Sequence, residues 1–317
     1  MDAERFTLEH PLVEEVEILI PDLLGIARGK RIPKHRLADL LAGRLSVSST
    51  VYALDSLGEN IEGSPLVHDE GDADRPLAPV AGSLRPAPWR PDRALALAAV
   101  VEPDGTPFWA DPRAALARVV AELERRGLRA CVAFEYEFYL LDPEPGPDGR
   151  PRPPRSARHG GRAGLVEVYD LERLADVDGF LDRLGRFCEA LELPLEAVSA
   201  EYAPGQFEVN LEHRGDPLRA ADDAFLFRIA VRRAAREAGL RATFAAKPFT
   251  GRAGAGCHVH LSLYDAGGAT CSASIPTEAG GWKRRWPACS PPPPLPWPSS
   301  RPTPTATGGW SRAPTRR

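Results

Sequence analysis

Several stretches of the chain alternate between apolar and polar residues, a pattern that predicts β-strands. In residues 131–141 one face carries large apolar side chains, whereas Glu135 and Glu137 lie next to each other on the opposite face. Residues 257–263 follow a glycine-rich turn and alternate in the same way. Their polar face carries His258, His260 and Ser262. The opposite face, which we expect to be core, carries Val259, Leu261 and Leu263.

Helices are marked by the residues at their ends as well as by their periodicity. Asp111 and Pro112 have the order typical of an N-cap and a first helical residue, and Gly127 stands just past the last periodic position. Asp216 and Pro217 begin a later helix in the same way. The helices expected from these signals and from amphipathic spacing cover residues 34–42, 112–126, 171–191 and 217–238.

The first hundred residues predict a small β-rich module. Residues 13–20 alternate and end at a Pro-Asp turn, and a second extended piece runs to Pro33, so we expect a hairpin. Residues 94–101 predict another strand. Long loops rich in Gly and Pro are expected at residues 58–88 and 143–164. Strands and helices follow one another throughout, which favours an α+β or α/β fold with a domain boundary just before Asp111.

Composition and charge narrow the class of protein. The 317 residues are 43% hydrophobic and 26% charged, as in a globular protein with room for two domains. No apolar run is long enough to span a membrane and the acidic N-terminus is unlike a signal peptide, so we expect a cytosolic protein. Residues 272–317 hold seven Lys or Arg and one acid, which leaves a net charge of −10 for residues 1–271 and argues against nucleic-acid binding. The five scattered cysteines are expected to be free thiols.

The carboxylates predict a divalent metal site. Two acids two residues apart on a strand repel each other unless a cation or a proton intervenes. A Pro-Gly turn at residues 204–205 could bring Glu201 and Glu208 together on adjacent strands. With Glu135, Glu137 and His258, these residues offer four oxygen ligands and one nitrogen, a set that suits Mg²⁺ or Mn²⁺. The alternative for Glu135 and Glu137 is a solvated strand face.

Three motifs in this order resemble the glutamine synthetase family. They are Phe-Glu-Tyr-Glu-Phe at 134–138, Glu-Tyr-Ala-Pro-Gly-Gln-Phe-Glu at 201–208, and Gly-Ala-Gly-Cys-His-Val-His-Leu-Ser at 254–262. The resemblance covers about residues 12–265. It implies an N-terminal β-grasp domain (1–108) and an incomplete catalytic domain (109–270) with a curved antiparallel sheet flanked by helices. It also implies a cytoplasmic homo-oligomer that takes part in nitrogen metabolism.

The same resemblance implies site residues and chemistry. Glu137, Glu201 and Glu208 would hold the metal near glutamate, and Glu135 with His258 would hold the metal on the ATP phosphates. His260 and Ser262 match positions near ATP, and Gly254 matches a backbone contact to glutamate. The implied reaction uses ATP and Mg²⁺ or Mn²⁺ to activate the γ-carboxylate as an acyl phosphate, which an amine or ammonia then attacks. The arginine and flap residues expected to catalyse it are not found after Leu263, so the catalytic residues are unknown.

Two departures from the family pattern bear on the amine. Ammonia-using members carry an Asp in the loop after the first helix, where Ser46 stands here. The Asn that usually precedes the glycines of the last motif is Ala253. Both changes favour a γ-glutamyl-amine ligase over glutamine synthetase itself, which stays the alternative. A non-catalytic metal-binding relative and a cupin-like oxygenase built on His258 and His260 are the other hypotheses.

The composition changes abruptly at Cys271. Residues 271–317 contain eleven prolines and four of the six tryptophans, and no apolar periodicity remains. One interpretation is a Pro-rich disordered tail, in which residues 291–296 could bind a proline-recognising module. We favour a second interpretation, a frame change in GC-rich coding DNA near residues 266–272 that replaced the native C-terminal third. On either interpretation we expect no catalytic residue in this segment.

Overall fold

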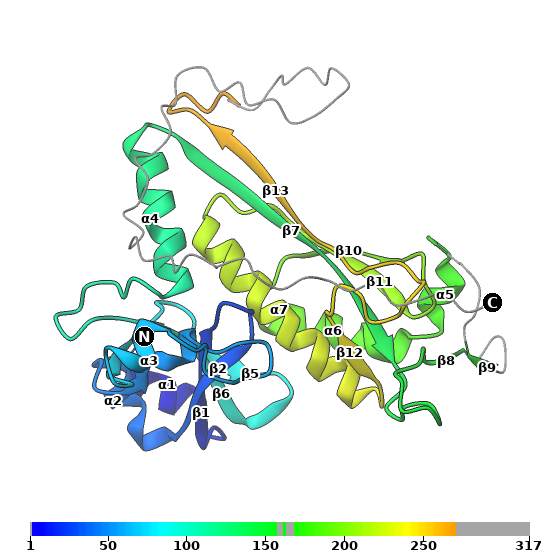
Figure 1. Cartoon of the computed structure of the whole chain (residues 1–317), viewed down its shortest axis with the longest axis horizontal. Helices are drawn as coiled ribbons and strands as arrows, with labels where there is room; N and C mark the ends of the chain where they lie inside the picture. Colours follow the sequence, from blue (N-terminus) through cyan, green and yellow to red (C-terminus); the bar gives the residue numbers. More distant parts are fainter. Residues whose placement is uncertain (1, 157–160, 163–167, 271–317) are drawn as a thin grey trace, which may run out of the picture. The chain divides into compact units, whose positions relative to one another are not determined.

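The computed structural model describes residues 2–156, 161–162 and 168–270. In this part of the chain helices are mixed with mostly antiparallel strands, which confirms the α+β class. The described strands form a six-stranded sheet, a five-stranded sheet and a two-stranded ribbon. Figure 1 shows the first sheet in blue and cyan and the second in green to orange.

The six-stranded sheet is built on the hairpin expected from residues 13–33. β1 (Glu15–Pro21) pairs antiparallel with β2 (Ala27–Pro33) and in parallel with β6 (Arg90–Val100). The expected strand at 94–101 is therefore the greater part of β6. The other strands of this sheet are β3 (Ser46–Ser48), β4 (Asp74–Pro79) and β5 (Arg85–Ala87). The short helices beside it are α1 (Ala3–Glu9), α2 (Leu37–Leu41) and α3 (Pro65–His68), with 3₁₀ turns at Lys34–Arg36 and Ser49–Tyr52.

The expectation of a long loop over residues 58–88 is wrong in part. The segment contains α3, β4 and β5. Leu77 of β4 is fully buried and pairs with Val100 of β6. This segment contains prolines, and it forms a strand because it pairs with β6, a contact that local composition does not predict.

The five-stranded sheet has the predicted strand at 131–141 at its centre. β7 (Arg129–Leu141) pairs on one side with β11 (Gln206–Leu211) and on the other with β12 (Arg241–Thr243) and β13 (Cys257–Tyr264). β10 (Leu195–Ala200) lies beyond β11, and every pair in this sheet is antiparallel. Figure 1 shows β13 running alongside β7.

Helices cover the apolar face of β7. The ring of Tyr136 stacks on that of Phe227 of α7 (Pro217–Glu237) with centroids 6.0 Å apart. Phe138 contacts Phe180 of α6 (Asp178–Ala190) at the same distance. Because side chains alternate along a strand, Glu135 and Glu137 project from the face that α6 and α7 do not cover.

The remaining helix expectations are confirmed with one correction. α4 (Pro112–Arg125) begins at the predicted cap, where the carboxylate of Asp111 accepts a hydrogen bond from the Ala114 amide. The single helix expected over 171–191 is instead two, α5 (Leu171–Ala175) and α6, because the chain turns at Asp176 and Val177. Asp176 is held there by the guanidinium of Arg173, 2.9 Å away.

The expected loop at 143–164 also contains a short ribbon, formed by β8 (Arg155–Ser156) and β9 (Gly161–Arg162). Cys131, Cys188 and Cys257 are free thiols, as expected. The other two cysteines and the expectations for residues 271–317 lie outside the described residues.

The core assignment for one face of β13 is wrong at two of its three positions. Val259 and Leu261 are each 57% exposed, and only Leu263 is buried. β7 is the only strand that pairs with residues 257–263 of β13 within the described residues. The alternating pattern therefore predicted the strand correctly. It did not predict whether other residues cover the apolar face of that strand.

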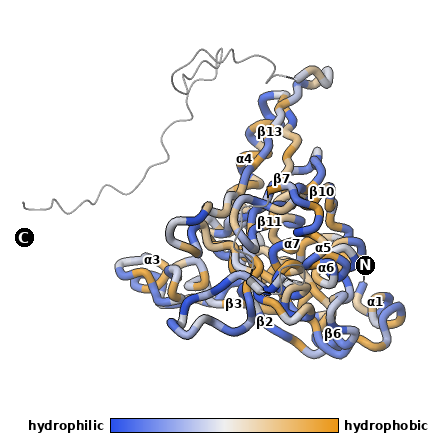
Figure 2. Tube along the Cα trace, turned by 90° about the vertical axis from the view of Figure 1, so that its right-hand side faces the viewer, coloured by the Kyte–Doolittle hydropathy of each residue, from blue (hydrophilic) through white to orange (hydrophobic). Residues whose placement is uncertain are grey.

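Figure 2 shows hydrophobic and hydrophilic positions interleaved along the trace rather than collected in one long segment. None of the described helices is both long and apolar enough to cross a membrane.

Candidate active site on the central sheet

Strand register brings the predicted acidic residues together. Glu208 of β11 lies directly opposite Glu137 of β7, and Asn210 lies opposite Glu135. On the other side of β7, His258 of β13 lies opposite Glu135. Three carboxylates and an imidazole from three strands therefore share one region of the sheet.

Glu135 is held by polar groups from both neighbouring strands. One carboxylate oxygen accepts a hydrogen bond from Asn210 Nδ2 at 3.0 Å and lies 3.2 Å from His260 Nε2, while the other contacts His258 Nδ1. Burial raises the pKa of Glu135, but the two histidines outweigh that effect, so its pKa is lowered overall. The hydrogen bond to Glu135 raises the pKa of His258 in return.

Glu137 is tied to the glycine-rich turn through Gln206. Gln206 Nε2 donates to Glu137 Oε2 at 2.7 Å and to the carbonyl of Gly254 at 2.8 Å. The hydroxyl of the buried Tyr139 donates to the carbonyl of Ala253 at 2.6 Å, and its oxygen also lies 3.2 Å from Gln206 Oε1. This network fixes the backbone at 253–254, the segment expected to touch glutamate, relative to a predicted metal ligand.

Gly256 allows the same turn to approach the carboxylates. A Cβ at this position would lie 2.8 Å from Glu137 Oε1 and 3.3 Å from the His258 ring. The Glu137 amide donates to the Gly256 carbonyl at 3.0 Å. Any larger residue would have to displace a side chain of the site.

Glu208 carries the clearest electrostatic signature. Burial and the negative charges of Glu135, Glu201 and Glu137 raise its pKa to about 7. Glu201 directly follows the end of β10 rather than lying within a strand, and its negative charge contributes to the raised pKa of Glu208. Ionisation of all the carboxylates on this face at neutral pH is therefore unfavourable.

The donor chemistry of this face fits a hard divalent cation. Carboxylate oxygens and an imidazole are present. Burial and repulsion between the carboxylates raise the pKa of Glu208, and a bound cation would relieve that repulsion. In the side-chain arrangement of the described residues, however, no group of three His, Cys, Asp or Glu residues is positioned to hold a metal ion. Glu135 and Glu137 instead engage His258 and Gln206.

Other predicted residues lie further along the strands or in the first sheet. Ser262 lies opposite Cys131, two register positions beyond His260 and four beyond His258 and its partner Glu135. Ser46 is in β3 of the six-stranded sheet, where its hydroxyl donates to Asp74 at 3.3 Å. Sequence reasoning missed Tyr139 and Asn210, although both stand at alternate positions on strands that carry the acids.

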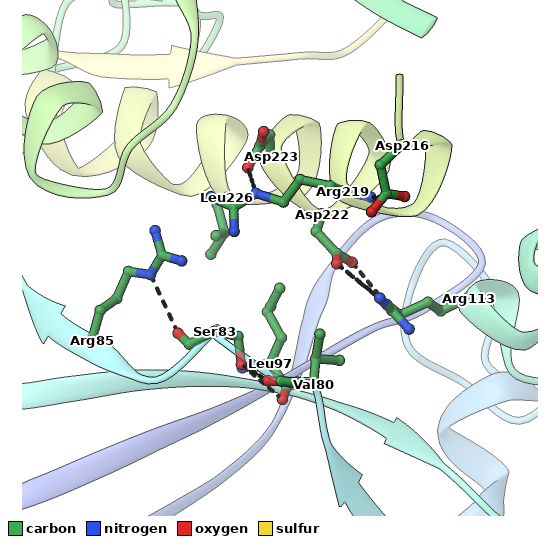
Figure 3. A pocket seen from close by; sticks show the side chains of 11 residues that line it. Val80, Ser83, Arg85, Leu97, Arg113, Asp216, Arg219, Asp222, Asp223 and Leu226 are labelled. Atoms are coloured by element: carbon green, nitrogen blue, oxygen red, sulfur yellow. Dashed lines mark hydrogen bonds and ion pairs between the residues drawn. The ribbon is translucent and has the colours of Figure 1, made fainter. Parts of the chain in front are cut away.

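A polar cavity of about 90 Å³ lies between α7 and the six-stranded sheet (Figure 3). Arg113, at the start of α4, makes hydrogen bonds of 3.0–3.3 Å to both carboxylate oxygens of Asp222. Arg85 hydrogen-bonds backbone carbonyls, including that of Gly82 at 2.9 Å. Arg219 holds Asp223 at 2.8 Å. Two ion pairs, Arg113–Asp222 and Arg219–Asp223, therefore line this cavity, and in this it differs from the acidic face.

Comparison with known proteins identifies the family. The sequence matches the family described as glutamine synthetase, catalytic domain, over residues 109–278. It is 36% identical to gamma-glutamylputrescine synthetase PuuA of Escherichia coli (strain K12), over 83% of this chain and 56% of that protein. It is 27% identical to a glutamate–isopropylamine ligase of a Pseudomonas species, over 83% of this chain and 57% of the ligase.

Solved structures agree with this match. A complex of GmaS with ADP superimposes with a TM-score of 0.70 and 30% identity, covering 85% of this chain and 57% of that one. A structure described as a novel glutamine synthase homolog gives a TM-score of 0.67 at 30% identity, covering 81% of this chain and 57% of that one. The fold of this chain is therefore shared with these solved structures. The chain belongs to the glutamine synthetase family, and it spans little more than half the length of these relatives.

Proposed function

We propose that this chain forms the metal- and nucleotide-binding part of an ATP-dependent ligase that joins the γ-carboxylate of glutamate to an amine. The acidic face carries the proposal, because register places Glu208 opposite Glu137 and the pKa of Glu208 is raised to about 7. Such a concentration of negative charge favours a site for cations and for the phosphates that accompany them.

Each predicted site residue has a role in this proposal. Glu137, Glu201 and Glu208 would hold one divalent metal, and Glu135 with His258 would hold the other. The metals, Mg²⁺ or Mn²⁺, would supply charge neutralisation at the phosphate oxygens. Gly254 would contact glutamate through its backbone, which Gln206 fixes at 2.8 Å. His260, which contacts Glu135, and Ser262 would lie towards ATP.

The chain's own groups would prepare the reaction by orientation. Tyr139 and Gln206 hold the 253–254 turn, so the glutamate carboxylate would meet a fixed backbone. His258 keeps Glu135 ionised through their contact, since the pKa of Glu135 is lowered. The γ-carboxylate would attack ATP, release ADP and form an acyl phosphate, from which the amine displaces phosphate.

The proposal includes the domain organisation expected from the sequence. Residues 1–108 would form a β-grasp domain, 109–270 the incomplete catalytic domain, and 271–317 a tail without site residues. The antiparallel five-stranded sheet flanked by α6 and α7 supports the catalytic part. A cytoplasmic homo-oligomer completes the proposal.

A bulkier amine is favoured over ammonia as the second substrate. Ser46 stands where an acid is expected in ammonia-using members, and its hydroxyl is engaged with Asp74. Two relatives are named for amines, putrescine in one and isopropylamine in the other. Glutamine synthetase remains the second candidate, because a glutamine synthetase of Rhizobium meliloti is 31% identical to this chain.

The test uses a chimera in which residues 1–264 continue into the C-terminal part of the Escherichia coli relative. Release of ADP is measured with glutamate, ATP and Mg²⁺, and with either putrescine, isopropylamine or ammonium. We expect faster release with an amine than with ammonium between pH 7 and 9. A preference for ammonium would assign the chain to glutamine synthetase, and no turnover with any of them would favour the non-catalytic relative.

A further inference from the structure

Two arginines of α7 share one aromatic ring. Arg228 and Arg232 are one helical turn apart, and each guanidinium carbon lies 5.2 Å from the centroid of the Phe244 ring. Both side chains are half-buried. Like charges at this spacing repel each other, and removal from water strengthens the repulsion.

No carboxylate neutralises this pair among the described residues. Arg228 Nη1 lies 3.5 Å from the Leu24 carbonyl, and its buried Nε has no hydrogen-bond partner in the described part of the chain. Burial and then the charge of Arg228 lower the pKa of Arg232, and no acidic group opposes that shift. The pair therefore carries two positive charges without a counter-charge.

Other arginines of the same helix are treated differently. Arg219 donates to Asp223 at 2.8 Å, and Arg233 lies 3.9 Å from Glu17. Arginines elsewhere on α7 thus have acidic partners, whereas Arg228 and Arg232 have none among the described residues.

No carboxylate forms an ion pair with Arg228 among the residues that the structure describes. The titratable side chains that its charge reaches include the Tyr136 phenol and the Cys257 thiol, and neither of them is a carboxylate. Gly25 closes the other side: its φ is +66°, and a Cβ there would lie 2.1 Å from Arg228 Nη1. The backbone at Gly25 leaves room for the guanidinium of Arg228 but supplies no negative charge.

We infer that Arg228 and Arg232, seated on Phe244, form a binding site for a small oxyanion such as a phosphate or a carboxylate. Guanidinium groups present planar pairs of donors that match the oxygens of these anions. An anion would satisfy the buried Nε of Arg228 and remove the repulsion between the two charges. The site is on the helix-covered face of β7, whereas Glu135 and Glu137 project from the other face.

The experiment measures the thermal unfolding of the full chain in EDTA with added inorganic phosphate, with succinate, or with sodium chloride at matched ionic strength. With a ligand at about ten times its dissociation constant, we expect Tm to rise by about 3 °C above the chloride reference. Phosphate alone identifies a phosphate site and succinate alone a carboxylate site, and either result supports the inference. No rise with either anion overturns it.

Variants locate the effect. Arg232→Gln should abolish the anion-dependent rise and leave Tm without anion unchanged or higher, because it removes the repulsion. Arg232→Lys keeps the charge without the planar fork and should retain only part of the rise. Arg236→Gln, an exposed position on the same helix, is the matched control and should respond like the parent. An unaltered rise in Arg232→Gln would overturn the assignment.

Discussion

Two groups of acids in this chain differ in their surroundings: those beside the six-stranded sheet and those on the open face of the five-stranded sheet. Beside the six-stranded sheet, the buried acids Asp22 and Asp111 both have several donors: Asp22 accepts hydrogen bonds from the Ile26 amide at 2.7 Å and from Arg28 at 2.9 Å. Asp111 is fully buried and accepts hydrogen bonds from three donors. In the five-stranded sheet, Glu208 faces Glu137 and its pKa is raised to about 7.

This difference distinguishes carboxylates that stabilise the fold from carboxylates that are available to bind a ligand. A buried carboxylate with several donors stabilises the folded state. A carboxylate beside other carboxylates destabilises it and is relieved only by a proton or a cation. Removing an acid should therefore have opposite effects on stability in the two sheets.

The largest effect is expected at Asp111. Its carboxylate accepts hydrogen bonds from the Tyr52 hydroxyl and the Val100 amide, both at 2.8 Å, and from the Ala114 amide at 2.9 Å. Asp111→Ala removes the cap of α4 and leaves two buried donors unsatisfied, so we expect a loss of about 3–4 kcal/mol in the free energy of unfolding. Urea denaturation measures it as a lower midpoint at an unchanged slope.

The control for this change is Asp104→Ala, in an exposed turn, which should leave the midpoint nearly unaltered. Tyr52→Phe removes only one of the three donors and should fall between the two. A loss in Asp111→Ala no larger than in Asp104→Ala would contradict the contrast between the sheets.

The second prediction concerns metal. Mn²⁺ should raise the stability of the parent chain by about 2.7 kcal/mol when its concentration is a hundred times the dissociation constant. Glu137→Ala or Glu208→Ala should weaken Mn²⁺ binding in calorimetry, whereas Glu237→Ala, on the surface at the end of α7, should not. Unchanged Mn²⁺ affinity in both site variants would remove the metal assignment.

Much of the fold on which this contrast depends could be predicted from the sequence, because local signals determine individual helices, strands and turns. The cap at Asp111, the alternation of residues 131–141 and the Pro-Gly turn each depend on neighbours in the chain, and all three are found in the structure. The spacing of the carboxylates predicted a metal site, and the family motifs then indicated the ligase reaction.

What the sequence could not provide is the packing between distant segments. β4 was missed because its identity depends on pairing with β6, and Val259 was assigned to a core that the described residues do not build. The Gln206 and Tyr139 network was missed for the same reason: its hydrogen bonds join β7, β11 and the 253–254 turn. Such contacts become visible only when the register is known.

The third prediction tests a charge pair at the boundary between the sheets. Asp222 is largely buried, and burial raises its pKa despite the bond to Arg113. Asp222→Ala leaves the guanidinium without a partner, and we expect a loss of about 2 kcal/mol, below the range for fully buried pairs because Arg113 is partly exposed. The double variant with Arg113→Ala should lose less than the sum of the single losses. Strict additivity of the two would show that the pair is not coupled.

The smallest effect is a dependence of stability on pH that arises from Glu208. The folded state raises its pKa from 4.5 to about 7, so between these values the folded protein holds a proton that the unfolded chain has released. This contribution to stability is fully present below pH 4.5 and declines until pH 7, above which it is constant. Partial exposure and screening keep it small.

Glu208→Gln cannot ionise and should lack this decline. In EDTA, the urea midpoint of the variant should therefore rise relative to that of the parent from pH 5 to pH 7 and then stay level. Saturating Mn²⁺ at pH 7.5 should reverse the order, because the parent then gains a ligand-linked stability that the variant loses. Midpoints of parent and variant that run parallel from pH 5 to pH 8 would mean that the repulsion at Glu208 is absent, and the opposition between the two sheets would no longer hold.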